Sequence, residues 1–181
     1  MEYRRLGKTD LKVSVIGFGG IPVQRIDTTS AERVVERAVE LGINFFDTAR
    51  AYTDSEEKLG VALKAHRDQV IIATKSMARD KKSMAEDIDK SLRTMGVDYI
   101  DLYQMHNVKD KGTLEQVLGV NGALAALIEA KEKGRIRHIG VTGHIKGILL
   151  EILKTGEIET VQFPFNPVET DGAKDVIDLA G

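Results

Sequence analysis

The sequence has 181 residues, of which 42% are hydrophobic, and this is enough for one ordinary domain with a full core. Its 26 lysines and arginines nearly balance 28 aspartates and glutamates, and the formal net charge of -2 argues against nucleic acid and anionic membrane surfaces as partners. Cysteine is absent, which excludes disulfides and thiolate metal sites within these residues and is typical of a cytoplasmic protein.

The predicted elements begin with a hairpin. Residues 3–6 and 11–16 have strand-like composition and flank turn residues at positions 7–10. The glycine-rich stretch at residues 17–20 lacks the third glycine of the dinucleotide-binding fingerprint. We therefore interpret it as a turn at the end of strand one.

Strand-like and helix-like patterns alternate through the rest of the chain. The predicted strands are mainly apolar and cover residues 43–48, 70–75, 99–106, 136–143 and 160–166. The predicted helices have apolar residues three or four positions apart. They begin at the capping patterns Thr29-x-x-Glu32, Asp54-x-x-Glu57 and Ser83-x-x-Glu86, or cover residues 123–133, 148–156 and a segment from Ala173.

This alternation predicts an α/β fold built from βαβ units with a parallel sheet. Because the strands are apolar almost without interruption, both faces of the sheet should be covered. Two architectures satisfy these conditions, an open doubly wound sheet and a closed (β/α)8 TIM barrel. No linker, low-complexity tract or domain boundary interrupts the pattern, and no apolar run approaches the roughly 20 residues of a membrane span.

Several predicted strands carry an unusual polar residue near their carboxyl ends. Asp47, Lys75 and His106 end three strands, and Gln162 lies within another. In a barrel, the carboxyl ends of the strands meet at one face, where active sites form. A buried carboxylate is costly unless it is paired, so we expect Asp47 to pair with Lys75 of the neighbouring strand.

Tyr52 follows Asp47 by five residues and is expected in the loop over the barrel mouth. A phenol beside the Lys75 ammonium should have a lowered pKa and could donate a proton to an oxygen that is gaining negative charge. His106 could hydrogen-bond the same oxygen. Such a set can polarise and protonate a carbonyl, but only a nicotinamide cofactor could supply the hydride.

The chain resembles the aldo-keto reductases. The stretches LGINFFDTARAY, VIIATKS, IDLYQMH, IRHIGVTGH and VQFPFN occur in the order of that family, and the first 20 residues resemble its N-terminal hairpin, which closes the barrel bottom. The resemblance implies a TIM barrel whose catalytic residues are Asp47, Tyr52, Lys75 and His106. Tyr52 would be the general acid that reduces an aldehyde or ketone, reversibly, together with the cofactor.

The resemblance also implies where the cofactor binds. NADPH is expected, with NADH as the alternative, and Gly20, Ile21 and Asp47 would lie near the nicotinamide ribose. The residues Thr142, Gly143 and Gln162 match positions that hold the carboxamide. The sequence Thr142-Gly143-His144 departs from the Ser-Asn pair often found there. No metal site is expected.

The chain contains about six strand–helix units, whereas a TIM barrel has eight. We therefore interpret residues 1–181 as a single barrel domain that is incomplete at its C-terminus and lacks the region for the cofactor's phosphates. Self-association through the open barrel edges and weak NADPH binding are expected. Part of the sequence resembles a subgroup whose longer members carry an iron–sulfur extension, but no cysteine for such a cluster is present.

Other interpretations stay open. A non-catalytic redox-sensing subunit could have the same fold, and Lys75 could serve as the nucleophile of a Schiff-base lyase. Taken singly, Asp47 could cap a loop and Gln162 could satisfy buried backbone groups. The sequence at residues 79–82 is interpreted as a solvated loop.

Overall fold

The computed structural model describes residues 1–181 and contains two sheets. Strands β1 (Tyr3–Arg5) and β2 (Lys12–Ser14) form an antiparallel hairpin. The second sheet has six parallel strands paired in chain order: β3 (Phe18–Gly19), β4 (Phe45–Asp47), β5 (Ile71–Ser76), β6 (Ile100–Met105), β7 (Ile136–Thr142) and β8 (Thr160–Gln162).

Helices connect the parallel strands. The α-helices are α1 (Thr28–Glu40), α2 (Ser55–Leu63), α3 (Lys81–Met95), α4 (Lys111–Leu118), α5 (Ala123–Glu132), α6 (Lys146–Leu153) and α7 (Ala173–Ala180). Two 3-10 helices, η1 (Pro22–Arg25) and η2 (Lys64–Gln69), precede α1 and follow α2. None of these helices combines the length and the apolar character that crossing a bilayer would require.

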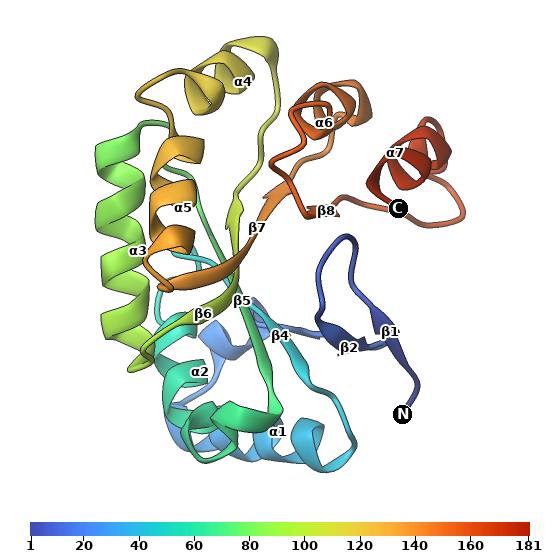
Figure 1. The fold of residues 1–181 in the computed structure, drawn as a ribbon. Coiled ribbons are helices and arrows are strands. Elements are labelled where there is room, and N and C mark those ends of the chain that lie inside the picture. The colour runs from blue at the N-terminus through green and yellow to red at the C-terminus, as the bar shows by residue number, and fades with distance from the viewer.

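The parallel sheet curls into an open half-barrel. Figure 1 shows α1, α2, α3 and α5 on its outside and the β1–β2 hairpin toward its open side. The strand order follows the chain without the reversal that defines a doubly wound sheet. The predicted α/β barrel architecture is therefore confirmed, as a half-barrel of six strands, and the doubly wound alternative is wrong.

The glycine-rich stretch contributes a strand where a turn was predicted. Phe18 and Gly19 form β3 and pair in parallel with Phe46 and Asp47 of β4. The amide of Gly20 extends this contact by donating to the Asp47 carbonyl at 2.7 Å. A strand of two residues is too short for hydrophobic periodicity to reveal it.

Two helices begin before their predicted capping boxes. The Asp27 side chain, and not Thr29, caps α1 by accepting a hydrogen bond from the Ser30 amide at 2.9 Å. In the same way, Asp80 caps α3 by accepting from the Ser83 amide at 2.9 Å. A carboxylate at this position bonds a free amide and also interacts favourably with the helix dipole, which explains why aspartate prevails.

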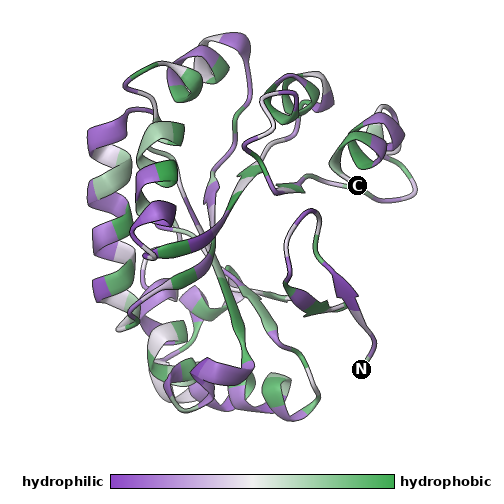
Figure 2. Ribbon diagram, in the orientation of Figure 1, coloured by the Kyte–Doolittle hydropathy of each residue, from purple (hydrophilic) through white to green (hydrophobic).

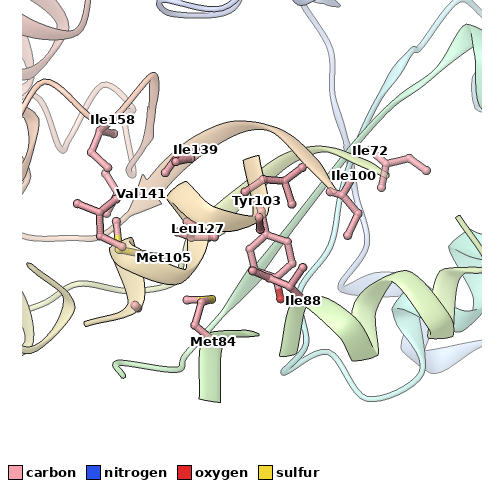
Figure 3. Packing of buried hydrophobic residues seen from close by; sticks show 14 of the residues in the cluster. Ile72, Met84, Ile88, Ile100, Tyr103, Met105, Leu127, Ile139, Val141 and Ile158 are labelled. Atoms are coloured by element: carbon pink, nitrogen blue, oxygen red, sulfur yellow. The ribbon is translucent and has the colours of Figure 1, made fainter. Parts of the chain in front are cut away.

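The main hydrophobic core lies between the sheet and the helices outside it. Figure 3 shows strand residues such as Ile72 and Tyr103 packed with Met84 and Ile88 of α3. Figure 2 shows polar and apolar residues alternating around α3, as expected of a helix with one buried face. Each fully buried large apolar side chain contributes about 1.5–3 kcal/mol, so this layer fixes the sheet on which the strand ends are presented.

The hairpin lies at the amino ends of the strands, as predicted. Asn44, just before β4, donates from its side chain to the Lys12 carbonyl at 2.9 Å. The Lys8 amide donates to the carbonyl of Glu159, just before β8, at 3.0 Å. The hairpin therefore closes the bottom of the half-barrel and leaves the carboxyl ends of the strands free.

The outer strands of the parallel sheet, β3 and β8, each pair on one side only. Apolar side chains close to these edges are exposed, and Ile16 and Phe165 retain 57% and 61% of their accessible surface. Such edges can template pairing with another chain. Self-association stays a prediction, which light scattering on the 181-residue chain would test.

Candidate active site

The polar strand ends converge because of the register of the parallel ladder. Asp47 in β4 pairs with Ala73 in β5, and Lys75, two residues further on, pairs with Gln104 in β6. Residues two apart along a strand share a face. Asp47, Lys75 and Gln104 therefore project to the inner face of the half-barrel, opposite the core that contains Tyr103.

Asp47 and Lys75 form the predicted ion pair. Lys75 Nζ donates to Asp47 Oδ2 at 2.6 Å and to the Thr48 carbonyl at 2.8 Å. The other carboxylate oxygen, Asp47 Oδ1, accepts from Gln104 Nε2 at 3.2 Å. Burial lowers the pKa of the Lys75 ammonium, while the Asp47 carboxylate opposes this shift. Gln104 of β6 thus occupies the second oxygen of the Asp47 carboxylate. One N–H of the Lys75 ammonium has no acceptor.

Tyr52 lies in the loop between β4 and α2, which continues along the end of β5. The Thr48 and Arg50 amides donate to the carbonyls of Ala73 and Lys75 at 2.8 and 2.9 Å. These bonds bring the Tyr52 ring over the strand ends, with its centroid 5.1 Å from Lys75 Nζ. The ring also meets His106 edge-on, at a centroid distance of 5.9 Å and an angle of 89°.

The expected lowering of the Tyr52 pKa is wrong for this structure. Burial, followed by the negative charge of Asp47, raises the pKa of the Tyr52 phenol. The Lys75 ammonium cannot reverse this, because Asp47 Oδ2 lies 2.6 Å from it and compensates most of its charge. The phenol is therefore protonated at neutral pH, which is the state that a proton donor requires.

His106 is an uncharged imidazole at the cavity wall. Burial and the positive charges of Lys75, Arg79 and His144 lower its pKa to about 4. Its amide extends the β6 ladder by donating to the Ser76 carbonyl at 2.9 Å. Its Nδ1 is buried without a hydrogen-bond partner, so Nε2 is the ring nitrogen available to a ligand.

These side chains line one cavity of about 320 Å³ at the carboxyl ends of the strands. This volume lies near the lower limit of small-molecule sites, which span roughly 300–1,000 Å³. The cavity contains every predicted site residue except one: Ile21, Asp47, Tyr52, Lys75, His106, Thr142, Gly143 and Gln162. The four predicted catalytic side chains are thus brought together, while their chemical roles stay predictions.

Gly20 is the predicted site residue that does not line the cavity. It is buried, and a Cβ there would lie 2.6 Å from the Ser55 hydroxyl and 3.1 Å from the Asp47 carbonyl. The Ser55 hydroxyl donates to the Gly20 carbonyl at 2.9 Å. Gly20 therefore serves close packing between β3, β4 and α2, and Ile21 after it reaches the cavity.

The other end of the cavity offers polar groups for a flat amide-bearing ring. The Gln162 side chain is exposed and makes no hydrogen bond with the protein. The Thr142 hydroxyl accepts from the Asn107 amide at 2.9 Å, which leaves its own O–H free to donate. These residues fit the carboxamide of a nicotinamide. Gly143 could contact the carboxamide only through its backbone. A side chain is not tolerated at this position, because a Cβ there would lie 2.7 Å from the Val108 carbonyl.

Sequence reasoning did not assign four residues of this region: Gln104, His144, Phe163 and Pro164. Gln104 bonds Asp47, and the other three line the cavity. Strand alternation puts Gln104, two residues before His106, on the same face of the predicted strand, and this was a usable signal for Gln104. The others follow β7 and β8. The predicted strand at residues 160–166 is wrong beyond Gln162, where β8 ends, so strand alternation gives no direction for Phe163 and Pro164.

Residues 15–181 match the model of the "Aldo/keto reductase family". The chain belongs to the aldo/keto reductase family. This confirms the resemblance seen in the sequence.

Two curated oxidoreductases illustrate the relationship. L-galactose dehydrogenase from Arabidopsis thaliana is 40% identical over 162 residues, which cover 79% of this chain and 49% of that protein. The uncharacterized oxidoreductase YqkF from Bacillus subtilis is 32% identical over 180 residues, which cover 92% of this chain and 56% of that protein. The chain thus spans about half the length of these curated relatives.

A solved family structure has the same arrangement of strands. The holo form of aldo-keto reductase AKR11C1 from Bacillus halodurans aligns with a TM-score of 0.81 and 33% sequence identity. The alignment covers 91% of this chain and 58% of that one. The six-stranded half-barrel therefore corresponds to part of an aldo-keto reductase barrel.

Proposed function

We propose that the protein is an NAD(P)H-dependent aldo-keto reductase that reduces an aldehyde or ketone, with NADPH as the preferred cofactor and Tyr52 as the general acid. The observation that carries this proposal is the meeting of Tyr52, His106 and the Asp47–Lys75 pair at one cavity wall. Family membership supports it, and the name of the Arabidopsis relative supports alcohol oxidation as the reverse direction.

The proposed chemistry divides between cofactor and protein. A bound nicotinamide would deliver a hydride to the carbonyl carbon of the substrate. As the carbonyl oxygen gains negative charge, the Tyr52 phenol transfers its proton to that oxygen, and the phenolate that remains faces Lys75. The N–H of Lys75 that has no acceptor is available to stabilise this phenolate, since Asp47 and Thr48 accept the other two.

His106 would orient the substrate. Because its pKa of about 4 keeps the imidazole neutral at pH 7, it cannot compete with Tyr52 as a strong acid. A neutral imidazole with its proton on Nε2 can donate one hydrogen bond to the carbonyl oxygen and so fix the carbonyl beside the phenol.

Cofactor binding would use the residues at the other end of the cavity. Gln162 and the Thr142 hydroxyl have free polar atoms for the carboxamide, and Ile21 and Asp47 line the side on which a ribose would lie. The fit of Thr142 and Gln162 described above supports a nicotinamide here.

The lyase alternative is disfavoured by the geometry of Lys75. A Schiff-base nucleophile must be an unprotonated amine that is free to attack. Burial lowers the pKa of Lys75, but the Asp47 carboxylate at 2.6 Å and the Thr48 carbonyl at 2.8 Å both accept from its Nζ and hold it in place. Borohydride trapping with a keto substrate tests this directly. Covalent labelling at Lys75 would support the lyase and contradict the reductase.

Tyr52→Phe is the decisive test. In the natural protein that carries these residues, it is expected to lower kcat for 4-nitrobenzaldehyde with NADPH by at least about 100-fold, while NADPH affinity changes only a few-fold. Tyr99→Phe is the matched control, because that ring packs between Arg67 and Arg137 far from the cavity. Retained turnover in Tyr52→Phe would overturn the assignment. NADPH binding without any wild-type turnover would instead support a redox-sensing subunit.

A further inference from the structure

Arg79 lies outside the cavity lining but is joined to the segment that carries His106. The predicted solvated loop at residues 79–82 is wrong in two respects, because the Arg79 side chain is half-buried and residues 81–82 already belong to α3. Lys82 is exposed as expected. Arg79 Nη2 donates to the carbonyls of His106 and Asn107, at 2.8 and 2.9 Å. One guanidinium nitrogen thus binds two successive carbonyls immediately after β6.

The backbone of Asn107 makes this double contact feasible. In an extended strand, successive carbonyls point to opposite sides, but Asn107 has a φ of 54°, in the left-handed region. This turn directs the carbonyls of residues 106 and 107 to the same guanidinium. On the other side, the Asn107 amide donates to Thr142 Oγ1 and the Val108 amide to the Thr142 carbonyl, both at 2.9 Å.

Arg79 is itself held by the start of α5. The Arg79 carbonyl accepts from the Ala123 amide at 2.9 Å, and the Lys81 amide donates to the Asn121 carbonyl at 2.8 Å. Asp80 and Gly122 form an isolated antiparallel bridge between these contacts. The guanidinium therefore projects from a fixed piece of backbone, as a positioning group requires.

We propose that Arg79 is a positioning residue for His106, whose guanidinium fixes the left-handed turn at Asn107 and thereby the direction of the imidazole at the cavity wall. The effect of Arg79 on catalysis rests on the proposed function. Its effect on the turn at Asn107 and on the His106 imidazole does not depend on that function. No covalent step is assigned to Arg79, since it does not line the cavity.

The charged groups around His106 keep its imidazole neutral, and Arg79 is one of them. Lys75 from β5, Arg79 from the following loop and His144 from the loop after β7 all disfavour a second proton on the imidazole. Tyr52 meets the ring edge-on, and Asp47 is compensated by Lys75. Asp110, at the start of α4, acts on Arg79 and favours its charged form, although burial acts more strongly in the opposite direction.

The experiment follows the imidazole of His106 by NMR titration in Arg79→Gln, Arg79→Lys and Lys82→Gln. The last variant removes the same charge three residues further on, in the first turn of α3, at a side chain that is 87% exposed. Wild type and Lys82→Gln should titrate near pH 4, whereas the pKa of His106 should rise by at least about half a unit in Arg79→Gln. Arg79→Lys keeps the charge and should retain the low value.

Amide exchange and kinetics report on geometry. In Arg79→Gln, exchange at Asn107 and Val108 should accelerate at least about 10-fold, and kcat should fall about 10-fold while NADPH affinity is unchanged. Wild-type exchange and titration in Arg79→Gln would overturn the proposal. If that variant does not fold, Arg79→Lys carries the test, and unchanged exchange at Asn107 and Val108 in it would overturn the proposal equally. Titration and exchange need no turnover, so failure of the reductase assignment is distinguishable from failure of this role.

Discussion

Two acid–base pairs, Glu56 with Arg50 and Asp47 with Lys75, lie on opposite faces of the same sheet and differ in how completely their carboxylates are bonded. On the outer face, Glu56 Oε1 accepts from the hydroxyls of Thr74 and Ser91, at 2.7 and 2.8 Å, and Oε2 accepts from Arg50. On the inner face, Asp47 has one strong bond, from Lys75, and one longer bond from Gln104.

The difference separates a structural pair from a reactive one. Glu56 has donors on both oxygens and is only 2% exposed, so its carboxylate offers nothing to a ligand. Asp47 is 15% exposed and lines the cavity together with Lys75, whose third N–H has no acceptor. A charge pair can therefore be functional when it is buried enough to be strong and still has an unused hydrogen-bonding position that faces a cavity.

The largest effect is expected when the pair with the fully bonded carboxylate, Glu56 with Arg50, is broken. Glu56→Ala should lower the free energy of unfolding by about 3 kcal/mol or more, because the buried Arg50 loses its nearer carboxylate and keeps only Asp87 at 4.0 Å, and because two hydroxyls lose their acceptor. Urea denaturation measures this. Glu57→Ala, an exposed neighbour, is the control, and a loss in Glu56→Ala no larger than the control's would remove the distinction between the pairs.

Breaking the Asp47–Lys75 pair should destabilise the fold less than breaking the Glu56–Arg50 pair, but it should affect catalysis more. Lys75→Met is expected to lower the free energy of unfolding by about 3 kcal/mol, and by less than Glu56→Ala, because Asp47 can still contact solvent in the cavity. With the ammonium gone, the charge of Asp47 acts on Tyr52 without compensation, so the apparent pKa of the acid in the pH–rate profile should rise.

Lys90→Met, on the exposed face of α3, controls for the change of side chain. The pairing would be contradicted by an unchanged melting temperature together with an unchanged profile in Lys75→Met.

The smallest loss of stability is expected at Gln104, the second hydrogen-bond donor to Asp47. Gln104→Leu removes a single hydrogen bond of 3.2 Å to Asp47 Oδ1, which still faces the cavity, so we expect a loss of about 1 kcal/mol or less. Thermal unfolding compared with Gln116→Leu, an exposed site on α4, measures it. A loss as large as that of Lys75→Met would mean that Gln104, and not Lys75, holds the carboxylate.

Much of the site followed from the sequence because strand alternation and strand ends are local patterns. They placed Asp47, Lys75 and His106 at one end of a parallel sheet, with Tyr52, five residues after Asp47, in the loop above it, and the resemblance then gave these four residues their catalytic roles. The Tyr52 pKa could not be predicted, since it depends on burial and on which charge Lys75 compensates first.

The long-range contacts of the site were beyond sequence reasoning. Arg79 lies in a stretch rich in charge, a composition typical of solvated loops, and only the turn at Asn107 gives it two carbonyls to bind. The network around Glu56 brings together residues from a loop, two helices and two strands, and no local pattern indicates such a meeting. For the fold, the two-residue β3 was missed for the opposite reason, because the element is too short to have a pattern.

The hydrogen bond between Gln104 and Asp47 joins two strands that are not neighbours, since β5 lies between β4 and β6. It links residues 57 positions apart, whereas Lys75 and Asp47 are 28 apart. Because closing a longer loop costs more chain entropy, the lysine contact can form once β4 and β5 have paired, and the glutamine contact must wait for β6. During folding, the carboxylate is thus expected to be neutralised before the amide that orients it arrives.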